Sequence, residues 1–276
     1  GVRYIYKYQS AAKILGTVSE TDPNPAFPEH TDHRFVPYGG ISDPPVITPE
    51  NHLICVYSPI GHALKTTLCL TLGELLSKEA KVLYINMEGY SGLEKMLGIR
   101  NQRNFSDLIY DHTLNGEDVL HALQSYLKEK NGLWYMVPSS EAELQEMEPE
   151  QLLAVLSFLD NSSGFDHILL DPGPCVRGLT ELLKLCGLVL MPVRSDRISM
   201  AKIDEFREFL ASAPGKTGGD PAGSSLTERF RELKLPFFEE IGKEQRMGLR
   251  SSKILADHLR KEGLLSTIAY TRKPKP

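Results

Sequence analysis

The sequence lacks the marks of several protein classes. Its longest apolar runs, such as residues 187–193, are far shorter than the roughly 20 residues that span a bilayer, so we expect no transmembrane helix. Its four cysteines form no C-x-x-C pair, and no histidines stand at zinc-ligand spacing, so a histidine-built zinc site is not expected. We expect reduced, mostly buried thiols in a cytoplasmic protein.

Positive charge is not in excess either. The 31 Lys and Arg residues stand against 36 Asp and Glu residues, a formal net charge of −5, which argues against non-specific nucleic-acid binding through overall charge. The composition, 41% apolar and 24% charged, excludes collagen-like, coiled-coil and wholly disordered chains. The 276 residues allow one large domain or two small ones.

Regular structure is not expected in much of the first 50 residues. Prolines recur throughout residues 22–49 and discourage helices and strands there. The chain begins with Gly1 rather than Met, and no signal-peptide pattern follows, so we expect that residues are missing upstream. We interpret residues 1–50 as the end of one domain with a linker, and residues 51–276 as the main domain.

From residue 51 onward, short apolar runs alternate with segments of helical periodicity. This order predicts an α/β fold of three layers, with a mostly parallel sheet and helices on both faces. The predicted strands are 53–57, 81–86, 133–137, 167–170, 187–192 and 235–239. The predicted helices are 65–78, 117–130, 149–159, 179–185, 200–210 and 252–262.

The first of these units has the pattern of a phosphate-binding loop. Residues 53–68 run from an apolar strand through a loop into a helix that opens with Lys65, Thr66 and Thr67. In such a loop the lysine reaches the β- and γ-phosphates and the first hydroxyl binds Mg²⁺. The strict pattern G-x-x-x-x-G-K-[ST] fails, because Pro59 and Leu64 occupy the glycine positions. Taken alone, the tripeptide is more typical of an ordinary helix start, with threonines that cap the helix and a solvated lysine.

Acidic residues follow two other predicted strands. Glu88 comes after strand 81–86, and Asp171 ends the strand at 167–170. The carboxyl ends of neighbouring parallel strands share one crevice, so both carboxylates are expected near Lys65. Asp171 would then hold Mg²⁺ through water. The simpler alternatives are a strand-end cap for Asp171 and a surface carboxylate for Glu88.

These segments together resemble the MinD/ParA superfamily of deviant Walker A P-loop ATPases, most closely its CpaE-like branch, over roughly residues 51 to 265. The resemblance implies the three-layer P-loop NTPase fold, ATP and Mg²⁺ as ligands, and a nucleotide-dependent homodimer that positions cellular machinery through a protein partner. The matching segments are 58–67, 84–93, 165–171 and 190–196.

The resemblance also assigns roles to residues. Lys65 would hold the β- and γ-phosphates, Thr66 and Asp171 would hold Mg²⁺, and Glu88 stands where the family has an aspartate that orients the attacking water. Arg194 would lie near the base. Residues 6–10 look like the tail of a receiver-like domain that often precedes such ATPases. The remaining expected nucleotide contacts are Gly61, His62, Ala63, Leu64 and Thr67.

The loop departs from the family at three positions. Ile60 replaces the signature lysine that contacts phosphate across the dimer, and His62 and Leu64 replace glycines. A non-glycine residue in the left-handed region costs on the order of 1 to 2 kcal/mol. Two alternatives therefore stay open: a pseudo-ATPase scaffold that no longer binds nucleotide, and a signalling output module controlled by the upstream domain.

The C-terminal segment, residues 243–276, is rich in Lys and Arg. A basic amphipathic helix there would suit a membrane surface or a partner helix. The alternative is a helix that packs its apolar positions on the sheet and solvates its charges. The expected location is cytoplasmic, and the alternative is peripheral contact with a membrane surface.

Overall fold

The structure is a computed structural model. It describes residues 52–99, 103–174, 176–212, 226–235, 240–241, 243–244 and 251–269. The predicted extension over residues 1–50 and its boundary with the main domain lie outside the described residues.

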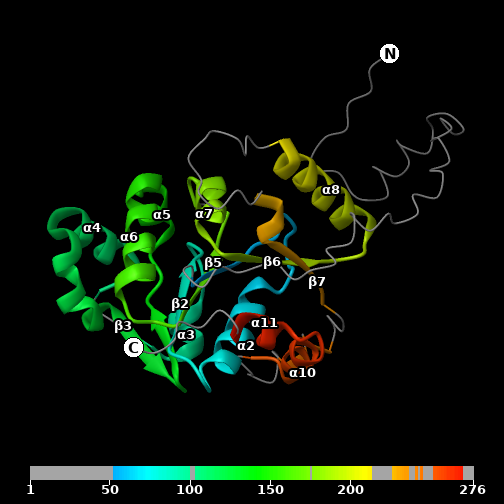
Figure 1. Ribbon diagram of the computed structural model, residues 1–276, viewed down its shortest axis with the longest axis horizontal. Coiled ribbons are helices and arrows are strands. Elements are labelled where there is room, and N and C mark those ends of the chain that lie inside the picture. The colour runs from blue at the N-terminus through cyan, green and yellow to red at the C-terminus, as the bar shows by residue number, and fades with distance from the viewer. Residues whose placement is uncertain are drawn as a thin grey trace, which may run out of the picture. The chain divides into compact units, whose positions relative to one another are not determined.

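A seven-stranded sheet forms the centre of the fold, in the order β3-β4-β2-β5-β1-β6-β7 (Figure 1). Every neighbouring pair is parallel except β3 and β4, which are antiparallel. The parallel core strands are continuously buried because helices cover both faces of the sheet. The strands are β1 (Leu53–Val56), β2 (Val82–Met87), β3 (Leu127–Lys130), β4 (Leu133–Met136), β5 (His167–Pro172), β6 (Leu188–Val193) and β7 (Phe230–Lys234).

The helices divide between the two faces. Alternate residues of β2 show the division: Tyr84 packs into one apolar cluster and Ile85 into the other. The Tyr84 face carries α2 (Lys65–Leu76), α3 (Leu93–Leu97), α10 (Lys253–Lys261) and α11 (Leu264–Ala269). The Ile85 face carries α4 (Phe105–Asn115), α5 (Glu141–Glu146), α6 (Pro149–Ser162), α7 (Leu179–Leu185), α8 (Arg197–Ser212) and the 3-10 helices η1 (Gly116–Tyr126) and η2 (Leu226–Arg229). The predicted three-layer α/β fold is confirmed.

The predicted helix at 117–130 is wrong over its last four residues, and its earlier part is a 3-10 helix rather than an α-helix. Residues 116–126 are the 3-10 helix η1, and 127–130 form the edge strand β3. β3 turns into β4 through Asn131 and Gly132, whose φ angles are 58° and 81°. An Asn-Gly pair with two positive φ angles is the preferred two-residue hairpin turn, so the turn fixes an antiparallel strand where helical periodicity had been inferred.

The edge strand β7 was not predicted. It occupies Phe230–Lys234 and pairs with β6 from Val189 to Val193. Of the predicted strand 235–239, only Leu235 is among the described residues, and it belongs to no strand; residues 236–239 lie outside the described part of the chain. The helices α3, α4, α5 and α11 were not predicted.

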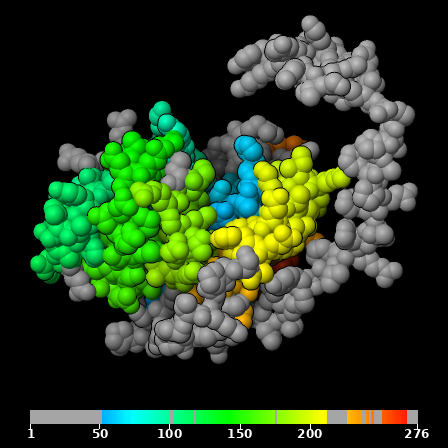
Figure 2. All heavy atoms as spheres, turned by 90° about the horizontal axis from the view of Figure 1, so that it is seen from above, coloured from blue at the N-terminus to red at the C-terminus, as the bar shows by residue number. Residues whose placement is uncertain are grey.

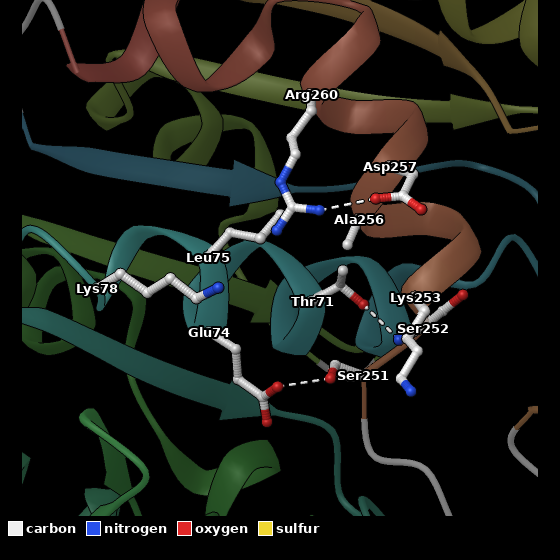
Figure 3. Close-up of a pocket in the computed structure, with 10 residues that line it drawn as sticks. All are labelled: Thr71, Glu74, Leu75, Lys78, Ser251, Ser252, Lys253, Ala256, Asp257 and Arg260. Atoms are coloured by element: carbon white, nitrogen blue, oxygen red, sulfur yellow. Dashed lines mark hydrogen bonds and ion pairs between the residues drawn. The ribbon is translucent and has the colours of Figure 1, made fainter.

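The basic C-terminal helix α10 packs against α2 on the Tyr84 face of the sheet. Leu255 and Leu259 are completely buried in the cluster formed with α2. At the junction, the backbone N–H of Ser252 donates to Thr71 Oγ1 of α2 (3.0 Å), and both residues line a pocket together with charged side chains of the two helices (Figure 3). The apolar stripe of α10 is therefore occupied by the protein core rather than offered to a membrane. None of the described helices is long and apolar enough to cross a bilayer.

Candidate functional site

The loop after β1 and the start of α2 form one wall of a cavity of about 740 Å³. Figure 2 shows this segment (blue) at the surface between α7 (yellow-green) and α8 (yellow). The cavity is lined by Tyr57, Ser58, Pro59, Ile60, Gly61, His62, Ala63, Leu64, Lys65, Thr66, Thr67, Glu88, Pro172, Gly173, Pro174 and Leu179. All the loop residues predicted to contact nucleotide thus line this one cavity.

The loop adopts the left-handed geometry that glycines normally supply. His62 has φ 54° and Leu64 has φ 58°, so both departures from the family pattern sit in the region that disfavours L side chains. Leu64 is also the N-cap of α2, and no side chain caps that helix. The N-terminus of α2 thus has no acidic or hydroxyl cap and lies at the cavity, where the positive end of the helix dipole would attract an anion.

The loop after β1 is held against the core by a hydrogen bond and by two buried side chains. Ser58 Oγ donates to the carbonyl oxygen of Pro192 at the end of β6 (2.8 Å). Ile60 and Ala63 are both buried in the apolar core. Ile60, which stands where the resembled family has its signature lysine, is thus buried among core residues of its own chain.

The sheet order brings Glu88 to the same cavity and places the buried Asp171 against Thr66 of the cavity wall. β5 lies between β1 and β2, so the strand that carries Asp171 stands next to the strands that lead to Lys65 and to Glu88. Lys65 Nζ lies 3.9 Å from a carboxylate oxygen of Glu88. Thr66 Oγ1 donates to Asp171 Oδ2 over 2.7 Å. Four side chains from three distant segments therefore meet.

Asp171 is buried and held by donors on one side only. Besides Thr66, the hydroxyl of Tyr84 (2.9 Å) and the amide of Asn86 (3.0 Å) donate to its Oδ2. Its Oδ1 is buried and has no hydrogen-bond partner. Burial, with Glu88 as the next cause, raises the pKa of this carboxyl from 3.8 to about 6. A cation or its water shell would satisfy the bare oxygen and favour the charged carboxylate.

Tyr84 and Asn86 belong to this site but were not predicted. Both lie on β2, on the face that also carries Asp171, and Asn86 stands opposite Asp171 in the parallel register. The signal was present in the sequence: two polar groups two residues apart in an otherwise apolar strand point to the same face. A buried polar side chain in such a strand needs a partner, and the neighbouring strand supplies Asp171.

Arg194 does not join the cluster. It follows β6, and its guanidinium pairs with Asp196 (3.2 Å) rather than lining the cavity. Asp196 in turn accepts hydrogen bonds from Ser199 at the start of α8. The placement beside the nucleotide base therefore stays a prediction.

The residues present fit a magnesium-bound triphosphate. A lysine, an uncapped helix N-terminus and loop N–H groups can hold phosphate oxygens. Thr66 Oγ1 is placed for direct ligation of Mg²⁺, and the bare oxygen of Asp171 for a water ligand. Both are hard oxygen ligands of the kind that Mg²⁺ prefers.

No protein-family model matches the sequence, and no curated protein matches it significantly. Solved structures do match the fold. A ParA family ATPase from Chlorobium tepidum TLS is 13% identical, with a TM-score of 0.55, covering 81% of this chain and 98% of that one. McdA from Cyanthece, solved without ligand, is 19% identical, with a TM-score of 0.50, covering 79% and 98%. The chain is therefore similar to the ParA family ATPases in its fold, a three-layer P-loop arrangement.

Proposed function

We propose that the chain is an ATP-binding regulator of the MinD/ParA type that positions other proteins, with weak or atypical ATPase activity. Lys65, Thr66 and Glu88 line one cavity, and the buried Asp171 contacts Thr66; this arrangement supports the function. A structural lysine at a helix start would not need a hydroxyl and two carboxylates from other strands around it. The similarity of fold to a ParA family ATPase points in the same direction.

In this proposal the cluster divides the work of phosphoryl transfer. Lys65 and the N–H groups of the loop hold the phosphate oxygens, and Thr66 and Asp171 hold Mg²⁺, which neutralises charge on the phosphates when bound. Glu88, 28% exposed at the cavity rim, orients the attacking water. Lys65 exchanges its contact with Glu88 for phosphate when the nucleotide enters. Positioning and charge complementarity supply the catalysis.

The unusual loop is the reason for proposing weak activity. Leu64 places a branched side chain in the cavity wall in a strained conformation, and this narrows the cradle. Ile60 cannot reach a phosphate bound to a second copy of the chain, because it is buried in its own core. A nucleotide-dependent homodimer of the CpaE-like type would then depend on surface contacts, and a protein partner would respond to that dimer.

Nucleotide titration tests the proposal. Isothermal calorimetry of the full chain with ATP and MgCl₂ should give saturable binding, and Lys65→Ala should weaken it at least tenfold through loss of a charge-assisted contact. Lys78→Ala, an exposed lysine just beyond the other end of α2, is the matched control and should bind as the wild type does. No heat and no thermal shift at millimolar nucleotide would overturn the proposal and favour a pseudo-ATPase scaffold.

A further inference from the structure

A tyrosine stands beneath the cluster in a position that no part of the proposed reaction uses. The ring of Tyr84 is fully buried between β2 and α2 and packs edge-on against Tyr135 of the neighbouring strand, with ring centroids 5.9 Å apart. Its hydroxyl reaches the end of β5 at Asp171. A phenylalanine would fill the same apolar space, so packing alone does not explain the hydroxyl.

The direction of each hydrogen bond follows from the backbone. The N–H of Glu88 can only donate, and it donates to Asn86 Oδ1 (3.0 Å), which fixes the orientation of that amide. The Asn86 Nδ2 group must then be the donor to both the Tyr84 hydroxyl oxygen (3.0 Å) and Asp171 (3.0 Å). Because the Tyr84 oxygen accepts from Asn86, its own proton goes to Asp171 Oδ2 over 2.9 Å.

This chain of donors runs one way, from the backbone of Glu88 to the carboxylate of Asp171. Three donors, from Thr66, Tyr84 and Asn86, meet on Oδ2, while Oδ1 has none. The carboxylate is thereby fixed in one rotamer, with its bare oxygen turned away from the donors. Such an arrangement is what a metal-facing carboxylate needs from its surroundings.

We infer that Tyr84 is a positioning residue for Mg²⁺: with Asn86 it orients the Asp171 carboxylate and ties it to the backbone of Glu88. The inference rests on the proposed function, since it concerns the same nucleotide site. It gives the site a link between its metal-facing carboxylate and the loop that carries the water-orienting carboxylate. The link is made by Tyr84 and Asn86 of β2 and does not involve the strained loop at His62 and Leu64.

The test separates binding of ATP from the response to Mg²⁺. ATP binding to the full chain is measured by calorimetry in EDTA and then at increasing MgCl₂, for the wild type and for Tyr84→Phe, which removes only the hydroxyl. We expect ATP affinity in EDTA to stay within about twofold, and the MgCl₂ concentration that gives half of the affinity gain to rise about tenfold or more, as for other outer-shell partners of metal ligands.

Tyr135→Phe is the matched control. It removes a buried tyrosine hydroxyl from the strand next to β2, at the residue paired with Tyr84 in the register, and it does not touch Asp171. Its response to Mg²⁺ should equal that of the wild type.

Three results would overturn the inference, and they differ from one another. An unchanged Mg²⁺ response in Tyr84→Phe would remove the positioning role while leaving the proposed function intact. An equal loss of ATP affinity in EDTA and in MgCl₂ would show that the hydroxyl only supports the fold. A wild-type chain that binds no ATP in either condition would remove the proposed function itself, and this inference with it.

Discussion

Thr66 and Asp171, 105 residues apart in the chain, are joined by a hydrogen bond of 2.7 Å. The bond connects the first turn of α2 to the end of β5. Its donor is the hydroxyl of the residue next to Lys65, and its acceptor is a buried carboxylate. In the proposed function these two groups hold one metal ion. In its absence the hydroxyl proton offsets part of the cost of burying the charge.

Asp171→Asn is expected to stabilise the chain without ligand and to remove the Mg²⁺ dependence of ATP binding. The folded pKa of about 6 lies above the ordinary 3.8, so the folded state binds the proton more tightly and stability falls as the pH rises from about 4 to about 6. Above that window the full cost, about 2 to 3 kcal/mol, is present. Urea denaturation should therefore show Asp171→Asn more stable than the wild type at pH 7 and equal to it near pH 3.5.

Asp196→Asn is the control for this pH dependence. Hydrogen bonds from Ser199 lower the pKa of Asp196, so its removal should reduce stability at neutral pH, the opposite direction. If the wild type and Asp171→Asn had the same free energy of unfolding at both pH values, the energetic cost assigned to the buried Asp171 carboxylate would be contradicted.

His62→Gly and Leu64→Gly are expected to separate backbone strain from packing. His62 is exposed with φ 54°, so glycine should raise the free energy of unfolding by about 1 kcal/mol. Leu64 has φ 58° but packs against the core cluster around α2, so the relief should be cancelled by lost apolar burial. ATP affinity should rise in both variants, most in Leu64→Gly, which opens the cavity wall. Urea denaturation and calorimetry measure the two effects, and unchanged affinity in both would argue against steric impairment of the loop.

Gly173→Ala is expected to disturb the Glu88 loop. A Cβ at Gly173 would lie 2.8 Å from the carbonyl oxygen of Met87 and 2.9 Å from Glu88 Cα, both backbone atoms, so the loop must move. We expect a loss of about 1 to 3 kcal/mol in the free energy of unfolding. Gly61→Ala is the control for stability, because its Cβ would meet nothing within 4 Å. Equal unfolding midpoints for the two variants would show that the loop at Gly173 and the loop at Glu88 are not in close contact in solution.

Glu88→Gln is expected to reduce hydrolysis much more than binding. Loss of the carboxylate should lower the rate of phosphate release by about 10²-fold or more, the range for a positioned acid or base. ATP affinity should stay equal or rise, because Lys65 loses its 3.9 Å partner and one negative charge leaves the cavity. Phosphate release and calorimetry measure the two quantities, with Glu94→Gln on the exposed side of α3 as control. A parallel fall in binding and turnover would assign Glu88 to nucleotide binding instead.

The fold could be predicted from the sequence where apolar runs and helical periodicity alternate, as in β1, α2 and β2. The hairpin of β3 and β4 was missed because the Lys-Glu-Lys segment at 128–130 carries no apolar alternation, and only the turn at Asn131 and Gly132 marks it. β7 was not predicted because its sequence, Phe-Arg-Glu-Leu-Lys, shows no strict apolar alternation.

The site was predictable to the extent that parallel strands bring their ends together. Lys65, Glu88 and Asp171 could be grouped because each lies at or just beyond the carboxyl end of a predicted parallel strand. The roles of Tyr84 and Asn86 depend on which strands are neighbours and on their register, which periodicity does not give. Arg194 was assigned by resemblance, and its contact with Asp196 could not be read from the pattern.

Ile60 has a consequence for the thermodynamics of ligand binding. With this side chain seated in the core and Ser58 bonded to the end of β6, the loop is held in shape before any ligand arrives. An incoming triphosphate would then have little conformational entropy to remove from the protein, and the strain at the neighbouring residues would already have been met by the free energy of folding. In the proposed function, this rigidity would offset part of the affinity lost through the imperfect fit of the loop.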